Sequence, residues 1–237
     1  AENIKSAGID ALIVIGGEGS MRGADLFNTE TGVPTIGIPA SIDNDIFGTD
    51  FSIGFDTAIN TALEAIDKIR DTASSHGRLF FVEVMGRSSD LIAIESGIAG
   101  GAEYLVLPEN QDAICDLCAR LSAAFSAGKR YAIVVVAEGN KPGCSFQIAA
   151  HVSEQIALES RVVVLGHIQR GGSPTARDRV LAAKLGVSAV YAYTKGHAGV
   201  MIGEVKRSIL LTPFYDVVNG KREPDIDIIR LAHILTK

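Results

Sequence analysis

Short apolar runs alternate along this chain with longer segments in which apolar residues recur every three or four positions. The short runs predict buried strands, and the longer segments predict amphipathic helices. We expect strands at residues 11–15, 33–38, 79–84, 104–107, 131–136 and 162–165. We expect helices at about residues 2–8, 20–27, 57–76, 90–99, 111–126, 145–158, 175–195 and 225–235, with one further short piece at 200–209 and a turn at 211–214.

This alternation predicts an α/β fold. Short loops join the predicted strands and helices, and the strands are nearly continuous apolar runs, as in parallel sheets that helices cover on both faces. One sheet would be large for all of these strands. We therefore expect two doubly wound, Rossmann-like αβα domains with mostly parallel sheets and a cleft between them.

Composition narrows the classes of function. The chain has 237 residues, of which 47% are hydrophobic, and its 22 basic and 28 acidic side chains give a formal net charge of −6. Because there is no basic block, nucleic acid and anionic membrane surfaces are not expected partners. No apolar run approaches the ~20 residues of a membrane span, and the first residues lack the layout of a signal peptide.

The three cysteines suit a reducing compartment, so we expect a cytoplasmic protein. Cys115 and Cys118 form a C-x-x-C pair, but they fall within a predicted helix and no second pair of ligands accompanies them. A packed thiol pair is the favoured interpretation, against a metal or redox site.

The segment after the predicted strand 33–38 carries the strongest candidate for chemistry. Pro39 closes that strand, and Asp43 and Asp45 lie one residue apart just beyond it. Ligand crevices of open α/β sheets lie at the carboxyl ends of the strands. One carboxylate there can act as a general base and the other can hold a metal ion. The alternative is an Asx-rich turn in which the Asp and Asn side chains bond their own backbone.

Other polar groups also follow predicted strands. Gly16 to Ser20, with Glu18 among them, join a strand to a helix, where free backbone N–H groups can bind a phosphate. A tight turn without a ligand fits this segment equally well. The remaining groups of this kind are Arg87, Glu138, His167 and Arg170. Acids that can hold a metal, together with arginines that can bind phosphate, favour phosphoryl transfer.

Together these motifs closely resemble those of the phosphofructokinase family. The resemblance covers essentially the whole chain. It rests on the segments GGEGS (16–20), PASIDNDI-GTD (39–50), IRDTASSHGR (69–78), VEVMGR (82–87), GIAGGAEYLVLPE (97–109), AEG (137–139), LGHIQRGGSP (165–174) and LTPF (211–214). GGEGS alone is weak, because related NAD and lipid kinases carry similar loops, whereas SIDND combined with LGHIQRGGSP is specific.

The resemblance implies a 6-phosphofructokinase, which transfers the ATP γ-phosphoryl group to the 1-hydroxyl of fructose 6-phosphate in glycolysis. The implied catalytic residues are Asp43 as the base, Ser41 beside the transferred group, and Arg87. The implied substrate-binding residues are Asp45, Arg78, Met85, Gly86, Glu138, Arg161, His167 and Arg170. Among the latter, the three arginines and the histidine would hold the 6-phosphate.

The resemblance also implies Mg²⁺ as cofactor and ATP as co-substrate. The implied residues are Glu18 and Asp45 for the metal, and Gly17, Gly19 and Ser20 for the nucleotide. Pyrophosphate-dependent relatives usually carry an aspartate at the position of Gly19 and a lysine at that of Ala40. A side chain at position 19 would occupy the space of the α-phosphate. Gly19 with Ala40 therefore favours ATP, and pyrophosphate is the alternative donor.

Partners and domains follow from the same resemblance. In the family, the counterparts of Arg78 and Arg161 reach in from a neighbouring subunit, which implies a homo-oligomer, at least a dimer and a tetramer at full length. Counterparts of Arg70, Glu103 and Lys129 contribute to an effector site. The implied domains are a partial nucleotide-binding domain (1–54 and 169–219) and a fructose 6-phosphate-binding domain (55–168 and 220–237).

Three features depart from the family pattern. Glu18 replaces an aspartate, which affects direct metal ligation more than phosphate binding, and Asp90 stands where a glycine is expected. The chain also begins at the helix before GGEGS, so the first domain would be N-terminally truncated and would expose apolar surface. We expect little or no kinase activity from these 237 residues alone. A non-catalytic sugar-phosphate-binding or assembly module is therefore a further alternative.

Overall fold

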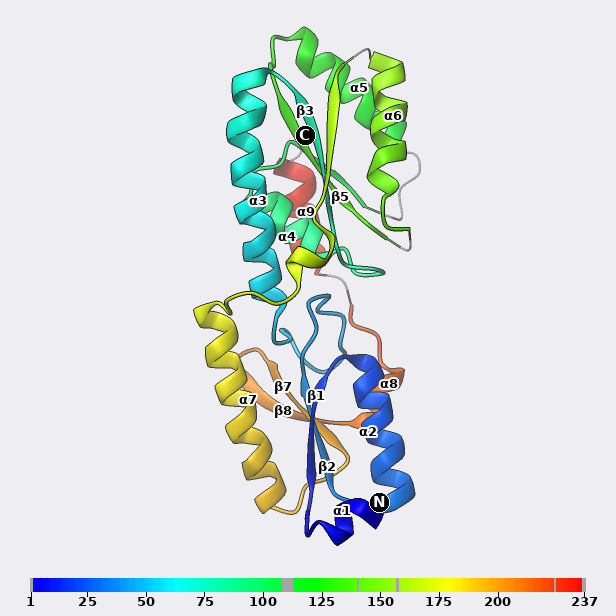
Figure 1. Ribbon diagram of the computed structural model, residues 1–237, viewed down its shortest axis with the longest axis vertical. Coiled ribbons are helices and arrows are strands. Elements are labelled where there is room, and N and C mark those ends of the chain that lie inside the picture. Colours follow the sequence, from blue (N-terminus) through cyan, green and yellow to red (C-terminus); the bar gives the residue numbers. More distant parts are fainter. Residues whose placement is uncertain (1, 108–112, 140, 157, 224, 236–237) are drawn as a thin grey trace. The chain divides into compact units, whose positions relative to one another are not determined.

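The chain forms two compact units, each built on one four-stranded sheet (Figure 1). The computed structural model describes residues 2–107, 113–139, 141–156, 158–223 and 225–235. Unit 1 comprises Ala1–Asp56 and Ser173–Glu223, and unit 2 comprises Thr57–Gly172 and Pro224–Lys237. The predicted α/β class with mostly parallel sheets is confirmed. Across the described residues, no helix is long and apolar enough to cross a membrane.

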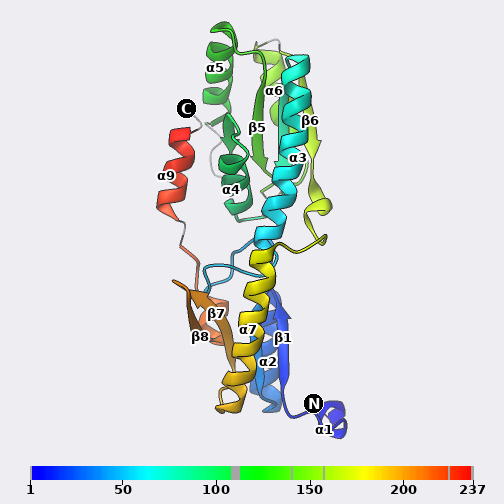
Figure 2. The same ribbon diagram turned by 90° about the vertical axis from the view of Figure 1, so that its left-hand side faces the viewer.

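Unit 1 has the strand order β1-β2-β7-β8, in which only β8 is antiparallel to its neighbour. Its strands are β1 (Leu12–Gly16), β2 (Thr35–Pro39), β7 (Val200–Val205) and β8 (Ser208–Pro213). Its helices are α1 (Glu2–Ser6), α2 (Glu18–Thr31), α7 (Ala176–Thr194) and α8 (Phe214–Asn219). Helices α2 and α8 cover one face of this sheet, and α7 covers the other (Figures 1 and 2).

An apolar stripe on α7 holds that helix against the sheet. Leu181, Leu185 and Ala189 recur at a spacing of four residues and pack against Ile36 on β2 and Ile202 on β7. Side chains four residues apart share one face of a helix, so a single stripe suffices for this contact. The opposite face of α7 carries Val187, which is 57% exposed.

The outer strand β1 leaves apolar side chains exposed. Ile13 is 44% exposed and Ile15 is 63% exposed, whereas Val14 between them packs under α2. β1 pairs with β2 alone in the described sheet. The predicted exposed apolar surface in this part of the chain is therefore present.

The hairpin of β7 and β8 corrects one prediction. The single short piece expected at 200–209 is wrong, because Val205 and Ser208 pair across a two-residue turn. Lys206 and Arg207 form this turn with φ angles of 50° and 66°. Such left-handed turns match the twist of a hairpin, but they are usually signalled by Asn-Gly or Asp-Gly, and Lys-Arg gives no such signal. The expected turn at 211–214 is the end of β8 and the start of α8.

Unit 2 contains a fully parallel sheet in the order β4-β5-β3-β6. Its strands are β3 (Leu79–Val84), β4 (Tyr104–Val106), β5 (Ala132–Ala137) and β6 (Ser160–Val164). Its helices are α3 (Phe55–His76, whose first two residues belong to unit 1), α4 (Leu91–Ala99), α5 (Ala113–Ser126), α6 (Cys144–Ile156), the 3₁₀-helix η1 (Gly166–Gln169) and α9 (Ile226–Leu235). Helices α5 and α6 cover one face of this sheet, and α3, α4 and α9 lie on the other (Figures 1 and 2).

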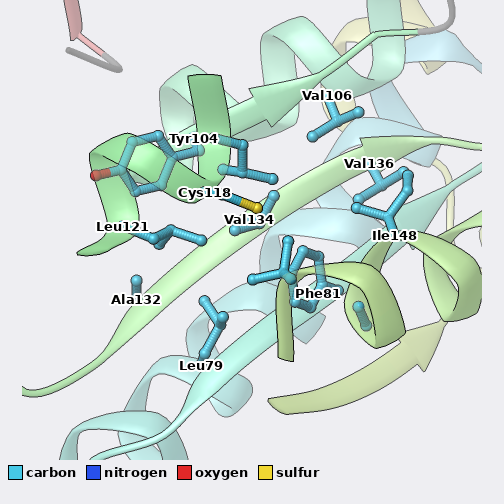
Figure 3. Close-up of a cluster of buried hydrophobic side chains, with 13 residues drawn as sticks. Leu79, Phe81, Tyr104, Val106, Cys118, Leu121, Ala132, Val134, Val136 and Ile148 are labelled. Atoms are coloured by element: carbon cyan, nitrogen blue, oxygen red, sulfur yellow. The ribbon is translucent and has the colours of Figure 1, made fainter. Parts of the chain in front are cut away.

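The core beneath α5 and α6 is built from alternate residues of the strands. Phe81 and Val134 from the sheet gather there with Leu121 from α5 (Figure 3). Cys118 joins this cluster, whereas Cys115 is exposed, so the predicted packing of both thiols is wrong for Cys115. The two cysteines lie three residues apart on a helix, which turns Cys115 toward the edge of the buried stripe.

A buried carboxylate ties β3 to the start of α6. Glu83 is 1% exposed and accepts hydrogen bonds from the Gly143 N–H at 2.6 Å and from the Ser145 N–H and hydroxyl at 2.9 and 2.6 Å. The first N–H groups of a helix lack partners and carry partial positive charge, so an anion there is stabilised. Burial, followed by the nearby Glu83 carboxylate, raises the pKa of the Cys144 thiol to about 11. That thiol is therefore protonated at neutral pH.

We expect Leu185→Ala to destabilise unit 1 by about 2–5 kcal/mol, because it removes a fully buried side chain from the core under α7. Val187→Ala on the exposed side of the same helix should change stability by no more than about 0.5 kcal/mol. Urea unfolding followed by circular dichroism measures both. Equal losses for the two variants would contradict the assigned packing.

We expect Glu83→Met to destabilise unit 2 by about 3 kcal/mol or more, because the two buried donors of Ser145 and the part-buried Gly143 N–H at the start of α6 would lose their acceptor. Glu154→Met, at an exposed position of α6, is the matched control and should be nearly neutral. The same unfolding measurement applies. A Glu83→Met protein as stable as the control would show that the carboxylate is not needed to hold α6.

Candidate active site

Two motifs of unit 1 lie side by side at the carboxyl ends of β1 and β2. Gly16 and Pro39 are partners in the last pair of this parallel ladder, and the Ala40 N–H donates to the Gly16 carbonyl at 2.9 Å. A Cβ placed on Gly17 would lie 3.9 Å from the Cβ of Ser41. The glycine loop and the acidic segment, which follow different strands, therefore meet at one edge of the sheet.

Asn44 determines the shape of the acidic turn. It is 1% exposed with a φ of 52°, and its side chain accepts from the Ser52 N–H at 2.8 Å and donates to the Asp50 carbonyl at 3.1 Å. Because Asn44 turns inward, its neighbours lie further out: Asp43 is half-buried and Asp45 is exposed. The Asx-turn alternative expected Asp and Asn side chains to bond the backbone, but only Asp43 and Asp45 were predicted as site residues. Asparagine is one of the few residues that tolerate this backbone conformation.

Ser41 supports the position of Asp43. The Asp43 N–H donates to the Ser41 hydroxyl oxygen at 3.2 Å. The Ser41 carbonyl in turn accepts from the Ser52 hydroxyl at 2.6 Å. The turn is thus fixed by its own backbone and by small polar side chains, as the Asx-turn alternative expects. A rigid turn is also what a positioned base requires, so the same arrangement suits a catalytic Asp43.

The start of α2 is arranged to receive an anion. Gly17 occupies the N-cap with an extended backbone, and within the described residues no side chain caps this helix. The first helical N–H groups therefore have capacity for a ligand. A Cβ on Gly19 would meet none of the described atoms within 4 Å. Ser20 is exposed on the same turn, and its N–H bonds the Gly17 carbonyl at 2.9 Å.

The acidic residues of unit 1 suit a sparsely ligated metal. Among the described residues, no three histidine, cysteine or acidic side chains gather as a metal site. Mg²⁺ commonly takes only one or two protein carboxylates, with substrate phosphates and water as its other ligands. The exposed Asp45 fits this type of site. Glu18 pairs with Arg22 at 2.7 Å, so its carboxylate would have to exchange that partner for a metal.

Three loops of unit 2 meet at the carboxyl end of β3, one of the two inner strands of its sheet. The connection after β3 runs through α4 and that after β5 runs through α6, on opposite faces of the sheet. At such a switch point neighbouring loops separate and form a ligand crevice. Met85 to Arg87 follow β3, Glu138 follows β5, and residues 165–172 follow β6.

Side chains from the two flanking loops hold the segment Met85–Arg87. Glu138 accepts from the N–H groups of Gly86 and Arg87, both at 3.3 Å, and Gln169 accepts from the Met85 N–H at 2.8 Å. Arg87 has a φ of 50°, which is strained for a residue with a side chain. The Glu138 carboxylate thus supports the backbone that presents Arg87. Gln169 was not among the predicted site residues, and its only signal in the sequence was its place inside the motif LGHIQRGGSP.

The structure brings most of the predicted substrate residues of unit 2 to this edge. His167, Arg170 and Arg87 are exposed there, beside the buried Glu138. Asp90, which stands where a glycine was expected, is the N-cap of α4 with φ of −89°, a conformation open to any residue. The departure at this position therefore does not strain the loop next to Arg87.

Two predicted arginines lie near the opposite, amino ends of the strands of the same sheet. Arg78 precedes β3, and Arg161 pairs with Phe80 near the start of β6. Both contact Glu159, whose carboxylate lies 3.5 Å from Arg78 Nε and also pairs with the Arg161 guanidinium. β3 has six residues and so spans roughly 20 Å. Arg78 is therefore too far from the loop of Arg170 to bind the same phosphate within one chain, and Arg161 is paired with Glu159 at the end of the sheet where Arg78 lies.

The three predicted effector residues do gather in one place. Glu103 lies 3.9 Å from the Arg70 guanidinium and 3.3 Å from the Lys129 ammonium. Its second oxygen accepts from the Ile133 N–H at 2.7 Å, which fixes the carboxylate at the start of β5. Arg70 also donates to the Gly101 carbonyl at 2.7 Å. The charges of these three side chains sum to +1, which suits an anionic ligand.

Comparison with known proteins places these features in one family. The family model described as Phosphofructokinase matches residues 1–193. ATP-dependent 6-phosphofructokinase 1 of Thermus thermophilus is 50% identical over 232 residues, which are 98% of this chain and 72% of that protein. ATP-dependent 6-phosphofructokinase of Halalkalibacterium halodurans is 49% identical over 235 residues, which are 99% of this chain and 73% of that protein.

Solved structures agree with the sequence relatives. The structure of phosphofructokinase from Saccharomyces cerevisiae matches with a TM-score of 0.85 and 33% identity, covering 98% of this chain and 34% of that one. The pyrophosphate-dependent phosphofructokinase from Marinobacter aquaeolei matches with a TM-score of 0.82 and 25% identity, covering 95% of this chain and 64% of that one. The resemblance found in the motifs is confirmed, and the chain belongs to the phosphofructokinase family.

Proposed function

We propose that this chain carries the catalytic residues of an ATP-dependent 6-phosphofructokinase, which phosphorylates the 1-hydroxyl of fructose 6-phosphate. The main support is the meeting of the glycine loop and the acidic turn at one edge of the unit 1 sheet. The relatives at 50% and 49% identity carry the name of this activity. Unit 1 then supplies the donor side of the reaction, and the carboxyl edge of the unit 2 sheet supplies the sugar-phosphate side.

In the proposed reaction Asp43 acts as the base. It takes the proton of the 1-hydroxyl while that oxygen forms a bond to the γ-phosphorus and the bond from phosphorus to ADP breaks. Ser41 fixes the Asp43 backbone, and the start of α2 binds the donor phosphates through N–H groups. Mg²⁺, when bound at Asp45, would neutralise charge on those phosphates. Arg87, His167 and Arg170 bind and orient the substrate.

ATP is the donor that the residues of unit 1 favour. The space around Gly19 is open within the described structure, and Ala40 is uncharged, unlike the lysine usual at this position in pyrophosphate-dependent relatives. The pyrophosphate-dependent relative is 25% identical, against 50% for the ATP-dependent one. Pyrophosphate stays the alternative donor, because both kinds of enzyme share the fold.

The proposed substrate site needs a second copy of the chain. Along the sheet, Arg78 lies about 20 Å from the carboxyl end of β3, and Arg161 lies about 13 Å from Leu165, where the loop of Arg170 begins. They complete the 6-phosphate site only when they reach into the crevice of a neighbouring subunit. We therefore propose a homo-oligomer, at least a dimer, and an effector site at Glu103 with Arg70 and Lys129.

Asp43→Asn should greatly slow turnover while preserving substrate affinity. We expect kcat to fall by about 10²–10⁴-fold and the Kd for fructose 6-phosphate to stay within about twofold, because the amide keeps the shape but cannot accept the proton. Phosphorylation is assayed with ATP and with pyrophosphate in separate reactions, on the 237-residue chain and on any longer product of its gene. Binding is followed by calorimetry.

The outcomes of that assay separate the alternatives. Turnover with pyrophosphate only would overturn the assignment of ATP as donor. Binding of fructose 6-phosphate without turnover in any form of the protein would support the non-catalytic module. Robust turnover by the 237 residues alone would contradict the expected inactivity of this length of chain.

Complementation tests the shared site. Arg161→Ala and Arg170→Ala should each greatly weaken fructose 6-phosphate binding when present in every subunit. When the two variants are co-expressed, a mixed dimer contains one site with both arginines intact, so about a quarter of the sites should recover. Calorimetric stoichiometry counts those sites. No recovery in mixed oligomers would show that the two arginines do not serve one shared site.

A further inference from the structure

Gln169 reverses the usual distribution of side chains in its loop. Gln169 is 1% exposed, whereas the apolar Ile168 beside it is 64% exposed. Every residue from 166 to 174 is described, and Gln169 is the only buried one among them. An amide is normally left in water and an isoleucine buried, so a buried glutamine next to an exposed isoleucine needs a specific reason.

The reason lies in the ladder between β3 and β6. The Leu165 N–H still donates to the Glu83 carbonyl at 3.0 Å, as a continuing parallel strand requires. Leu165 itself then takes helical angles, φ −70° and ψ −44°, and the chain turns into η1. The Met85 N–H, which a longer β6 would have paired through its backbone, bonds Gln169 Oε1 at 2.8 Å instead.

On the other side of β3, a side chain likewise replaces the backbone of the neighbouring strand as hydrogen-bond partner. The Glu138 N–H donates to the Val84 carbonyl at 3.0 Å, and beyond it the Glu138 carboxylate bonds the N–H groups of Gly86 and Arg87 at 3.3 Å. The segment Met85–Arg87 is therefore held by one side chain from each flanking loop. Gln169 is the only one of the two that belongs to the loop of His167 and Arg170.

We propose that Gln169 is a positioning residue of the fructose 6-phosphate site, which locks the loop of His167 and Arg170 to the loop of Arg87. This inference rests on the proposed function and adds a residue to it. Gln169 has too little exposed surface to contact the substrate, so it acts through the residues on either side of it. Its effect is to keep the exposed phosphate-binding side chains at a fixed distance from Arg87.

Stability alone does not explain Gln169. Its second amide atom, Nε2, is buried and has no hydrogen-bond partner among the described residues. An apolar residue of similar size would leave the Met85 N–H unpaired but would remove the unpaired Nε2. Each unpaired buried donor carries a similar penalty, so the two arrangements should be nearly equal in stability. The hydrogen bond then contributes geometry rather than free energy of folding.

Gln169→Met tests this inference, with Ile168→Met as the matched control at the exposed neighbouring position. For Gln169→Met we expect a Kd for fructose 6-phosphate about tenfold or more above wild type, a thermal midpoint close to wild type, and faster amide hydrogen exchange at Met85 with unchanged exchange along β3. The control should leave all three unchanged. The measurements are calorimetry, thermal unfolding and exchange followed by NMR.

Each outcome decides a separate point. If wild type binds fructose 6-phosphate and Gln169→Met binds it equally well, the positioning role is wrong and the proposed function stands. If Gln169→Met unfolds or melts far earlier than the control, Gln169 is a stability residue and the inference is overturned. If wild type itself binds no fructose 6-phosphate, the proposed function fails and the inference falls with it.

Discussion

The end of the central strand β3 imposes the constraint on which the unit 2 site depends. Buried backbone N–H groups must find partners, yet both neighbours of β3 turn away before its chain does. Met85, Gly86 and Arg87 therefore bond side chains, namely those of Gln169 and Glu138. Those side chains sit on the loops that carry the exposed polar groups of the site. The side chains that pair the end of β3 therefore also fix the loops that carry these groups.

In unit 1, the backbone that follows a strand end also needs hydrogen-bond partners, and one side chain supplies them. Its strands β1 and β2 also end side by side, and Asn44 turns inward to pair the backbone of the segment that follows β2. A buried asparagine in the middle of Asp43-Asn44-Asp45 leaves its two acidic neighbours further from the core. Because the central side chain of the turn faces the core, the carboxylates on either side of it lie further out. One segment can therefore be both a tight Asx-type turn and the carrier of a candidate base.

The sequence predicted elements and motifs well and missed the long-range polar contacts. Apolar runs such as 131–136 mark buried parallel strands because both faces of those strands are covered. The hairpin at Lys206-Arg207 was not predicted, because neither residue signals a left-handed turn. The hydrogen bonds of Glu83 and Gln169 were not predicted for another reason. Their partners lie 60 and 84 residues away, and periodicity carries no information on contacts at that separation. The effector trio was found only through the family resemblance, because its members come from separate elements.

Under the proposed function, the carboxyl ends of the unit 2 strands bind substrate within the chain, and the arginines near their amino ends serve the site of a neighbouring subunit. The ion pairs of those arginines explain how one chain can carry both sets of residues. Arg78 and Arg161 share the carboxylate of Glu159, which is 58% exposed. Exposed ion pairs of this kind contribute little stability, so exchanging Glu159 for a phosphate would require little energy. A guanidinium bonds phosphate through two parallel N–H groups, and phosphate brings more charge than one carboxylate. Under the proposed function, the arginines would thus be compensated in a single chain and available to a neighbour, so that assembly and substrate binding would support each other.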